Sequence, residues 1–232
     1  MPLDLSILGQ GVYTPREVAR LIGATPQEII RWTRGSGPSD PLWKGYYQEI
    51  DDSAELSFAD LVEVRVVKSL RNAKVSMQAI RFAIQLANKK YGIDRPLSSL
   101  GFRTDGQEIL IEALEKDGQL MSLSKKRPGQ KVFKEIVQQS LVGLEYDEDR
   151  PVRWRPENTK HIVIDPARFF GEPIIDKFGV SSNTLYREFG EFGDISYLSQ
   201  IYEIPTALIK DAITFESGLD STLGKKHGQS TI

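Results

Sequence analysis

The chain has 232 residues, 40% of them hydrophobic and 27% charged, as in globular proteins with one large domain or two small ones. It contains no run of about 18 apolar residues, so the sequence predicts no membrane-spanning helix. Cysteine is absent, which excludes disulfides, thiolate zinc sites and cysteine nucleophiles. Residues 1–10 lack the basic start and long apolar stretch of a secretion signal, and we therefore expect a cytoplasmic protein.

The net charge is only −2, but the charges are distributed unevenly along the chain. Residues 1–91 hold 12 basic and 10 acidic side chains, residues 92–160 hold 12 of each, and residues 161–232 hold 6 and 10. Because phosphates attract positive charge, any DNA-facing surface is expected in the N-terminal part.

Two helix starts follow each other closely near the N-terminus. Thr14-Pro15-Arg16-Glu17 and Thr25-Pro26-Gln27-Glu28 both have the pattern of a capping box, with proline at the favourable first helical position. Gly23 and Gly35 are suited to end the two helices. Two short helices joined by a turn that contains glycine are typical of a helix-turn-helix.

The next segment, residues 36–55, is predicted to be a loop or a small hairpin around Lys44-Gly45. Helices are then predicted to begin at Ser57 and at Ser76, because apolar residues follow each serine at helical spacing.

The middle of the chain carries turn signals. Asp105-Gly106 and Asp117-Gly118 are typical of two-residue hairpin turns, so we expect a small β-meander over residues 102–124. A basic loop, Lys125-Lys126-Arg127, follows, and a basic loop of three residues is usually only solvated.

An amphipathic helix is predicted over residues 131–141. Val152 and Trp154 then alternate with polar residues like an edge strand. They lie in the highly charged segment 145–160, which is the best candidate for a domain boundary.

The C-terminal part is predicted to begin with a short strand over residues 161–166 and a turn and second strand over residues 171–175. Three helices are expected next, at about residues 182–191, 195–203 and 206–216. Residues 217–232 have few apolar side chains, so we expect a flexible tail.

The N-terminal pattern resembles a known family. Tyr13–Gly23, Trp32 in the second helix and Leu56–Val62 after the loop resemble the opening of MerR-like regulators, over about residues 12–82. In that family the first two helices form the DNA-reading unit and a hairpin acts as a wing. The long coiled coil of MerR activators is missing here, and so are the sensor cysteines, so metal sensing is not implied.

The C-terminal pattern resembles a second family. Ile162–Pro166, Phe170–Pro173 and Tyr202–Glu216 are similar to a small three-helix module of antitoxins that are encoded beside PIN-like ribonuclease toxins. The resemblance covers about residues 160–216. The two modules in one chain of this length resemble a VapB-type antitoxin, which implies a toxin partner.

The expected fold is therefore mainly α with small β elements. We expect four parts: a MerR-like winged helix-turn-helix domain (1–92), an α/β connecting region with the β-meander (93–160), a three-helix, helix-turn-helix-like module (161–216) and the flexible tail (217–232).

The second helix is the candidate recognition helix. Its outer residues Thr25, Gln27, Arg31 and Arg34 have side chains suited to base edges or phosphates in the major groove. The alternative is an ordinary solvated helix face. Lys44 and Tyr46, with Trp43, are candidate wing contacts to the DNA backbone, although aromatic rings in such a loop equally pack beneath it.

The last three helices are acidic, with Lys210 as the one basic residue among residues 195–216. Because acidic side chains repel phosphates, we expect protein contact here instead of DNA contact, although Thr206 and Lys210 face outward. The apolar positions of these helices are expected to be mostly core, with some of them lining an interface, and the candidate partner or dimer contacts among them are Ile201, Leu208, Ile209 and Phe215. The tail is either a toxin-binding segment that folds on binding or an inert terminus.

Signals for an enzyme are weak. Gly9-Gln10-Gly11 is too short for a phosphate loop, and no nucleophile elbow occurs. Neither His161 nor His227 has metal-ligand spacing, so no metal or cofactor is expected.

The sequence therefore predicts a non-enzymatic, antitoxin-like transcriptional autoregulator. It is expected to bind operator DNA as a homodimer, because one short recognition helix gives little contact alone, and to neutralise a PIN-like ribonuclease toxin. The first alternative is a ligand-gated MerR-like regulator without a toxin, with a pocket in residues 92–160. A protein-binding adaptor and a hydrolase are the remaining alternatives.

Overall fold

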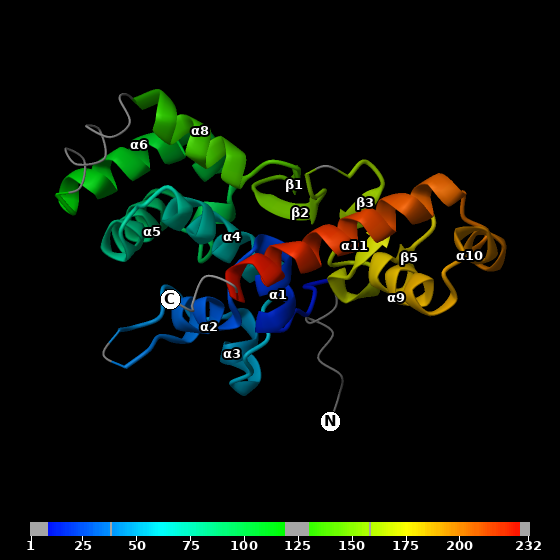
Figure 1. The fold of residues 1–232 in the computed structure, drawn as a ribbon. Coiled ribbons are helices and arrows are strands. Elements are labelled where there is room, and N and C mark those ends of the chain that lie inside the picture. The colour runs from blue at the N-terminus through cyan, green and yellow to red at the C-terminus, as the bar shows by residue number, and fades with distance from the viewer. Residues whose placement is uncertain (1–8, 38, 119–129, 158, 228–232) are drawn as a thin grey trace.

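The computed structural model describes residues 9–37, 39–118, 130–157 and 159–227, and these form mainly helices and one small sheet (Figure 1). The helices are α1 (Pro15–Ile22), α2 (Pro26–Arg34), α3 (Tyr46–Asp51), α4 (Phe58–Asn72), α5 (Met77–Tyr91), α6 (Leu100–Lys116), α8 (Gln130–Ser140), α9 (Ser182–Phe192), α10 (Ile195–Tyr202) and α11 (Thr206–His227), with 3-10 turns η2 (Pro96–Ser98) and η3 (Phe169–Gly171). The strands are β1 (Leu144–Asp147), β2 (Arg150–Trp154), β3 (Ile162–Ile164), β4 (Pro173–Ile175) and β5 (Val180–Ser181).

The five strands form one antiparallel sheet in the order β1-β2-β3-β4-β5. The strand predicted around Val152 and Trp154 is present as β2, but it is an interior strand, because Trp154 pairs with Ile164 of β3. The sheet therefore continues through the charged segment 145–160 and joins the central part of the chain to the C-terminal part.

Two clusters of buried side chains hold the molecule together. The larger one is built from α1, α2, α4, α5, α6 and α8 and reaches Ile164 of β3. The smaller one joins Ile162 of the same strand and Ile175 of β4 to α9, α10 and α11. No helix in the described part of the chain is long and apolar enough to cross a membrane.

Both predicted capping boxes are confirmed. The Thr14 and Thr25 hydroxyls each accept from the backbone N–H of the glutamate three residues later, at 3.2 Å, and each glutamate accepts from the threonine N–H. Gly23 ends α1 in the left-handed conformation, with φ of 64°, as its lack of a Cβ allows.

The predicted β-meander is wrong, because α6 occupies residues 100–116. The buried residues of α6 recur at helical spacing: Phe102, Gly106, Ile109, Leu110, Ala113 and Leu114. This face packs against α5 and α8, and Asp117-Gly118 ends the helix instead of turning a hairpin. The last segment of the predicted meander, residues 119–124, lies outside the described residues.

A wing-like hairpin is not found among the described residues of this segment, 36–37 and 39–45. An isolated bridge joins Ser36 and Ser39, and α3 begins directly after Gly45. Tyr47 of α3 is buried and donates its hydroxyl to the carbonyl of Gly11, at 2.7 Å, which fixes the short helix against the start of the domain.

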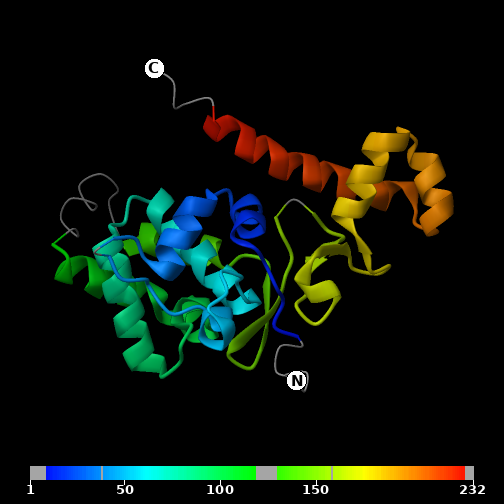
Figure 2. The same ribbon diagram turned by 90° about the horizontal axis from the view of Figure 1, so that it is seen from below.

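The expected flexible tail is replaced by helix up to His227. The three C-terminal helices are confirmed, but α11 extends well beyond residue 216 and crosses the molecule to reach α1 (Figures 1 and 2). Composition did not predict this extension because its stabilising contacts are made with residues far away in the sequence.

A buried ion pair joins α11 to α1. Glu216 is fully buried, and its carboxylate accepts from Arg20 at 2.5 Å and from the hydroxyl of Ser182 in α9. Arg20 also donates to Asp220, at 2.9 Å. Burial lowers the pKa of Arg20, but its bonds to Glu216 and Asp220 outweigh this and keep the pKa above its ordinary value.

A second contact joins the segments that carry the two family resemblances. Val12 donates its N–H to the carbonyl of Phe170, at 2.9 Å, and the buried Tyr13 hydroxyl lies directly against Gly171. A Cβ at Gly171 would overlap this hydroxyl, and the residue has φ of +89°. Only glycine is compatible with both conditions.

Replacement of Gly171 by alanine is expected to destabilise the protein by about 3 kcal/mol, the sum of an overpacked contact and a left-handed backbone. Gly193→Ala is the matched control, since Gly193 has φ of +69° but nothing within 4 Å of a Cβ. It should cost about 1 kcal/mol, measured like Gly171→Ala by urea unfolding. Equal losses for the two variants would show that the Tyr13 contact yields without cost.

Replacement of Glu216 by glutamine is expected to cost about 2–3 kcal/mol of unfolding free energy, because Arg20 loses its buried counter-charge but retains Asp220. Asp220→Asn should cost less than about 1 kcal/mol, since that carboxylate is half exposed. Calorimetric unfolding at low and high salt separates the two, because salt screens the exposed pair more strongly. A Glu216→Gln variant as stable as Asp220→Asn would contradict the role of the buried pair.

Candidate functional site

The first two helices form a compact unit. Val18 and Ala19 of α1 and Ile29 and Trp32 of α2 are buried in the larger core, and the short turn through the buried Ala24 sets the angle between the helices. The Thr25 side chain caps the start of α2, and the backbone N–H of Gly23 closes the end of α1 by donating to Ala19, so the turn has a fixed shape.

The outward face of α2 carries two of the predicted DNA contacts. Gln27 and Arg31 are exposed and lie four residues apart, which places them on the same face of the helix. Ile30 beside them is 41% exposed. Thr25 is half-buried, and its hydroxyl serves as the helix cap.

Arg34 is placed differently from the other predicted contacts. Its guanidinium donates to the carbonyls of Asp52 and Ser53 and forms an ion pair with the Asp52 carboxylate, at 2.8 Å. Arg34 therefore ties the end of α2 to the segment after α3. Arg31 is the basic residue of α2 that stays directed to solvent.

A buried carboxylate organises the loop before α3. Asp60 is fully buried and accepts from the indole N–H of Trp43 at 2.9 Å, the backbone N–H of Tyr46 at 3.0 Å and the guanidinium of Arg95 at 2.7 Å. It also accepts from the backbone N–H and the hydroxyl of Ser57, and the Ser57 hydroxyl caps α4 by accepting from the backbone N–H of Asp60. One charge thus connects the loop, the start of α4 and the segment after α5.

The neighbouring Glu63 does not compete for this cation. Glu63 is fully buried, and burial raises its pKa to about 8, although a hydrogen bond from Ser98 and the charge of Arg95 act in the opposite direction. At neutral pH Glu63 is therefore mostly protonated, and Asp60 is the carboxylate that pairs with Arg95.

The candidate wing residues are held by this network. Two roles were open for Trp43, a contact to the DNA backbone and packing beneath the loop. Its side chain is half-buried against the core, so it packs beneath the loop. Lys44 is exposed, and its carbonyl accepts from Arg95 at 2.8 Å. Tyr46 is half-buried and contacts the Tyr47 ring edge-on, at 5.2 Å between centroids.

Sequence reasoning missed part of this site. Arg16, in the first turn of α1, is exposed on the same two-helix unit, and the capping-box pattern that contains it does not indicate this. Arg95 lies in no recognisable motif, and its role depends on the distant Asp60. The loop Lys125-Lys126-Arg127 lies outside the described residues.

The predicted partner contacts divide into surface and core. Ile201 is 53% exposed, and Leu208 and Phe215 are half-buried at the edge of the smaller cluster. Ile209 is fully buried within that cluster, so of its two predicted roles, core residue and interface contact, the structure places it in the core. It lies on the face of α11 that packs against α9 and α10.

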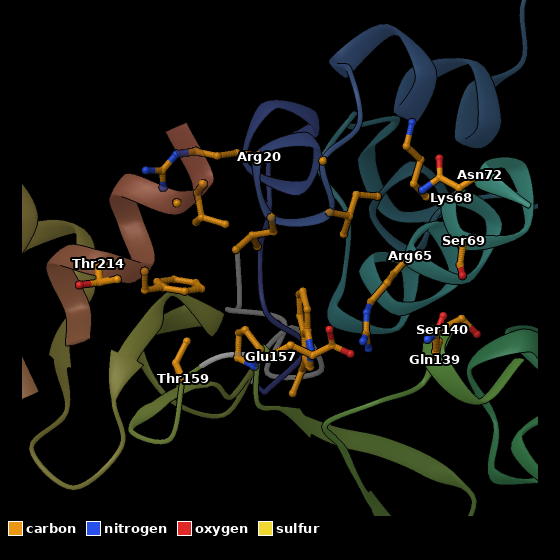
Figure 3. Close-up of a pocket in the computed structure, with 18 of the residues that line it drawn as sticks. Arg20, Arg65, Lys68, Ser69, Asn72, Gln139, Ser140, Glu157, Thr159 and Thr214 are labelled. Atoms are coloured by element: carbon orange, nitrogen blue, oxygen red, sulfur yellow. The ribbon is translucent and has the colours of Figure 1, made fainter. Parts of the chain in front are cut away.

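A groove of about 790 Å³ lies between α11, the N-terminal helices and the segment after β2 (Figure 3). Arg20, Arg65 and Lys68 line it, and each has a compensating group. Arg20 pairs with Glu216, Lys68 pairs with Glu28 at 2.9 Å, and Arg65 lies 4.5 Å from the centre of the Trp154 ring.

Lys68 is the most buried of the three groove cations, and Arg65 is half-buried. Burial lowers the pKa of Arg65 to about 10, and the charge of Glu157 raises it in part, so the side chain stays protonated at neutral pH. Within the described residues, its Nη1 and the Nε1 of Trp154 are buried donors without a hydrogen-bond partner. The part of the chain that the structure describes contains no cluster of three or more potential metal ligands.

Replacement of Asp60 by asparagine is expected to destabilise the protein by about 3 kcal/mol, because an amide nitrogen would face donors and Arg95 would lose its counter-charge. Limited proteolysis should then cut within residues 36–55 faster than in the wild type. Asp40→Asn, an exposed change in the same loop, is the control and should leave both measurements unchanged. Equal proteolysis rates for both variants would show that Asp60 does not hold the loop.

The chain was compared with known proteins, and no family model matches it. A curated protein of Mycobacterium tuberculosis (strain ATCC 25618 / H37Rv), named "Putative antitoxin VapB45", is 28% identical over an alignment that covers 73% of this chain and 78% of the relative. The crystal structure of Rv2018 from Mycobacterium tuberculosis matches with a TM-score of 0.69 and 26% identity, over 87% of this chain and 96% of that one. The chain is thus similar in sequence to a protein named as an antitoxin of the VapB type, which supports an antitoxin function.

Proposed function

We propose that this protein is an antitoxin of the VapB type that represses its own operator and neutralises a PIN-like ribonuclease toxin in the cytoplasm. The observation that carries the proposal is the 28% identity to the protein named "Putative antitoxin VapB45", which spans most of both chains. The geometry of the two-helix unit supports the DNA-binding part.

In the proposed complex α2 is the recognition helix of a MerR-like helix-turn-helix. Gln27 and Arg31 are the base-reading side chains. The amide of a glutamine donates to N7 of adenine and accepts from its N6 amino group, and the guanidinium of an arginine donates to both O6 and N7 of guanine. Lys44, Tyr46 and Thr25 contact the sugar-phosphate backbone beside them. Arg34 acts through the loop that it holds, and Arg16 adds positive charge to the same surface.

We propose that the protein binds its operator as a homodimer. A single α2 covers few base pairs, whereas two copies on half-sites about one helical turn apart provide the contact area of a specific complex. The C-terminal module supplies the toxin contact, because its surplus of acidic residues disfavours DNA.

The second candidate is a ligand-gated regulator without a toxin, and the groove beside α11 favours it. Its volume is in the range of small-molecule sites, and Arg65 and Trp154 supply two buried donors. Native mass spectrometry of the purified protein separates the candidates. A bound metabolite without a protein partner would support the ligand-gated regulator.

Replacement of Arg31 by alanine is expected to weaken operator binding by about 1–3 kcal/mol, while the thermal unfolding midpoint stays unchanged because Arg31 is exposed. Gln27→Ala should have a smaller effect of the same sign. Fluorescence anisotropy with operator DNA and with a scrambled duplex of equal length measures both affinity and preference.

Lys210→Ala is the matched control, since it removes one exposed positive charge from α11. Its operator affinity should equal that of the wild type, and wild-type affinity should fall steeply with salt. An unchanged affinity of Arg31→Ala would exclude α2 as the reader, and an equal loss for Lys210→Ala would place the DNA contact elsewhere.

A further inference from the structure

An exposed apolar strip lies where α9 meets α10. Phe192, Tyr197 and Ile201 are 55%, 42% and 53% exposed. The Phe192 and Tyr197 rings touch edge-on, with 5.2 Å between their centroids, and Ile201 lies one helical turn after Tyr197 on the same face of α10. The three side chains therefore form one continuous surface, which we call the apolar strip.

The apolar strip is held in a fixed shape. Gly193 ends α9 in the left-handed conformation, and Asp194 caps α10 by accepting from the N–H groups of Ser196 and Tyr197, at 2.8 and 3.1 Å. The Tyr202 hydroxyl donates to Glu188 at 2.7 Å and braces α10 against α9. A surface that is already ordered loses little conformational entropy when a partner binds.

The surroundings of the apolar strip are acidic. Glu191, Asp194 and Glu203 are exposed around it, and residues 188–209 contain no lysine, arginine or histidine. Apolar anchors within a rim of one charge are suited to a partner that has an apolar patch within a rim of opposite charge. A partner surface with basic side chains therefore complements this rim.

This charge disfavours two other occupants. DNA would be repelled by the carboxylates. A second copy of this chain in a two-fold dimer would place the same acidic rim against itself, which is unfavourable. A ribonuclease, in contrast, needs positive charge to hold the phosphates of its RNA, and so carries the complementary surface.

The position of the strip allows both proposed partners to bind together. In two perpendicular views α10 forms the end of the molecule opposite to α5 and α6, and α2 lies on their side of α1 (Figures 1 and 2). A partner on α10 therefore leaves the face of α2 that carries Gln27 and Arg31 open.

We propose that the apolar strip and its acidic rim are the docking surface for the basic ribonuclease that this protein neutralises. The inference rests on the proposed function and identifies the surface that performs its second half. Phe192, Tyr197 and Ile201 enter an apolar patch of the ribonuclease, and Glu191 and Glu203 face its lysine and arginine side chains.

The test measures binding of the full-length protein to the purified PIN-like ribonuclease encoded beside it, by calorimetry, and to operator DNA in parallel. Ile201→Ala should weaken ribonuclease binding about ten-fold or more, whereas Ile50→Ala, at a 45% exposed isoleucine of α3, should not. Glu191→Lys should slow association and Glu112→Lys, an exposed change on α6, should not.

The possible outcomes separate this inference from the proposed function. Loss of ribonuclease binding in Ile201→Ala and Glu191→Lys, with operator binding retained, supports it. Wild-type affinity in both variants overturns the docking surface but leaves the proposed function standing. Conversion of a dimer to a monomer by Ile201→Ala would assign the strip to self-association, and a wild-type protein that binds no ribonuclease overturns both proposals.

Discussion

A carboxylate that is removed from water must be matched by a cation, and Glu216 meets this requirement through Arg20, 196 residues earlier in the chain. The pair fixes where α11 crosses α1, and the bond from Ser182 extends the constraint to α9. Together with the packing of Tyr13 on Gly171, it joins the N-terminal helices and the C-terminal helices into one body. The direction of α2 and the position of α10 relative to it depend on these contacts.

Asp60 applies the same constraint on a smaller scale. It gathers Trp43, the backbone of Tyr46 and the guanidinium of Arg95, so that a loop without regular hydrogen bonding has a defined shape beside α2. The raised pKa of Glu63 avoids a second negative charge near the same cation. The loop beside α2 and the crossing of α11 over α1 are thus held by buried carboxylates, whereas Gln27, Arg31 and Ile201, which are proposed to contact partners, are exposed.

The sequence predicted those features that are encoded locally. The capping boxes of α1 and α2 and the helices α9 and α10 depend on residues three or four positions apart, and the outward face of α2 followed from them. The meander failed because Asp105-Gly106 is a turn signal only when packing does not oppose it, and α6 packs along α5 and α8. The extent of α11, the burial of Ile209 and the fixed position of Arg34 depend on residues distant in sequence, so local patterns could not reveal them.

The contact between Tyr13 and Gly171 has a consequence for how such a chain is inherited. Two segments far apart in the sequence meet there through a hydroxyl that fills the space of a missing Cβ, and again through Arg20 and Glu216. A chimera that took either half from another protein would place Tyr13 against a residue other than Gly171, or Gly171 against a residue other than Tyr13, unless the other protein has the same pair. Recombination between relatives is therefore expected to preserve Tyr13 together with Gly171 and Arg20 together with Glu216, so that the N-terminal and C-terminal halves are exchanged together and not separately.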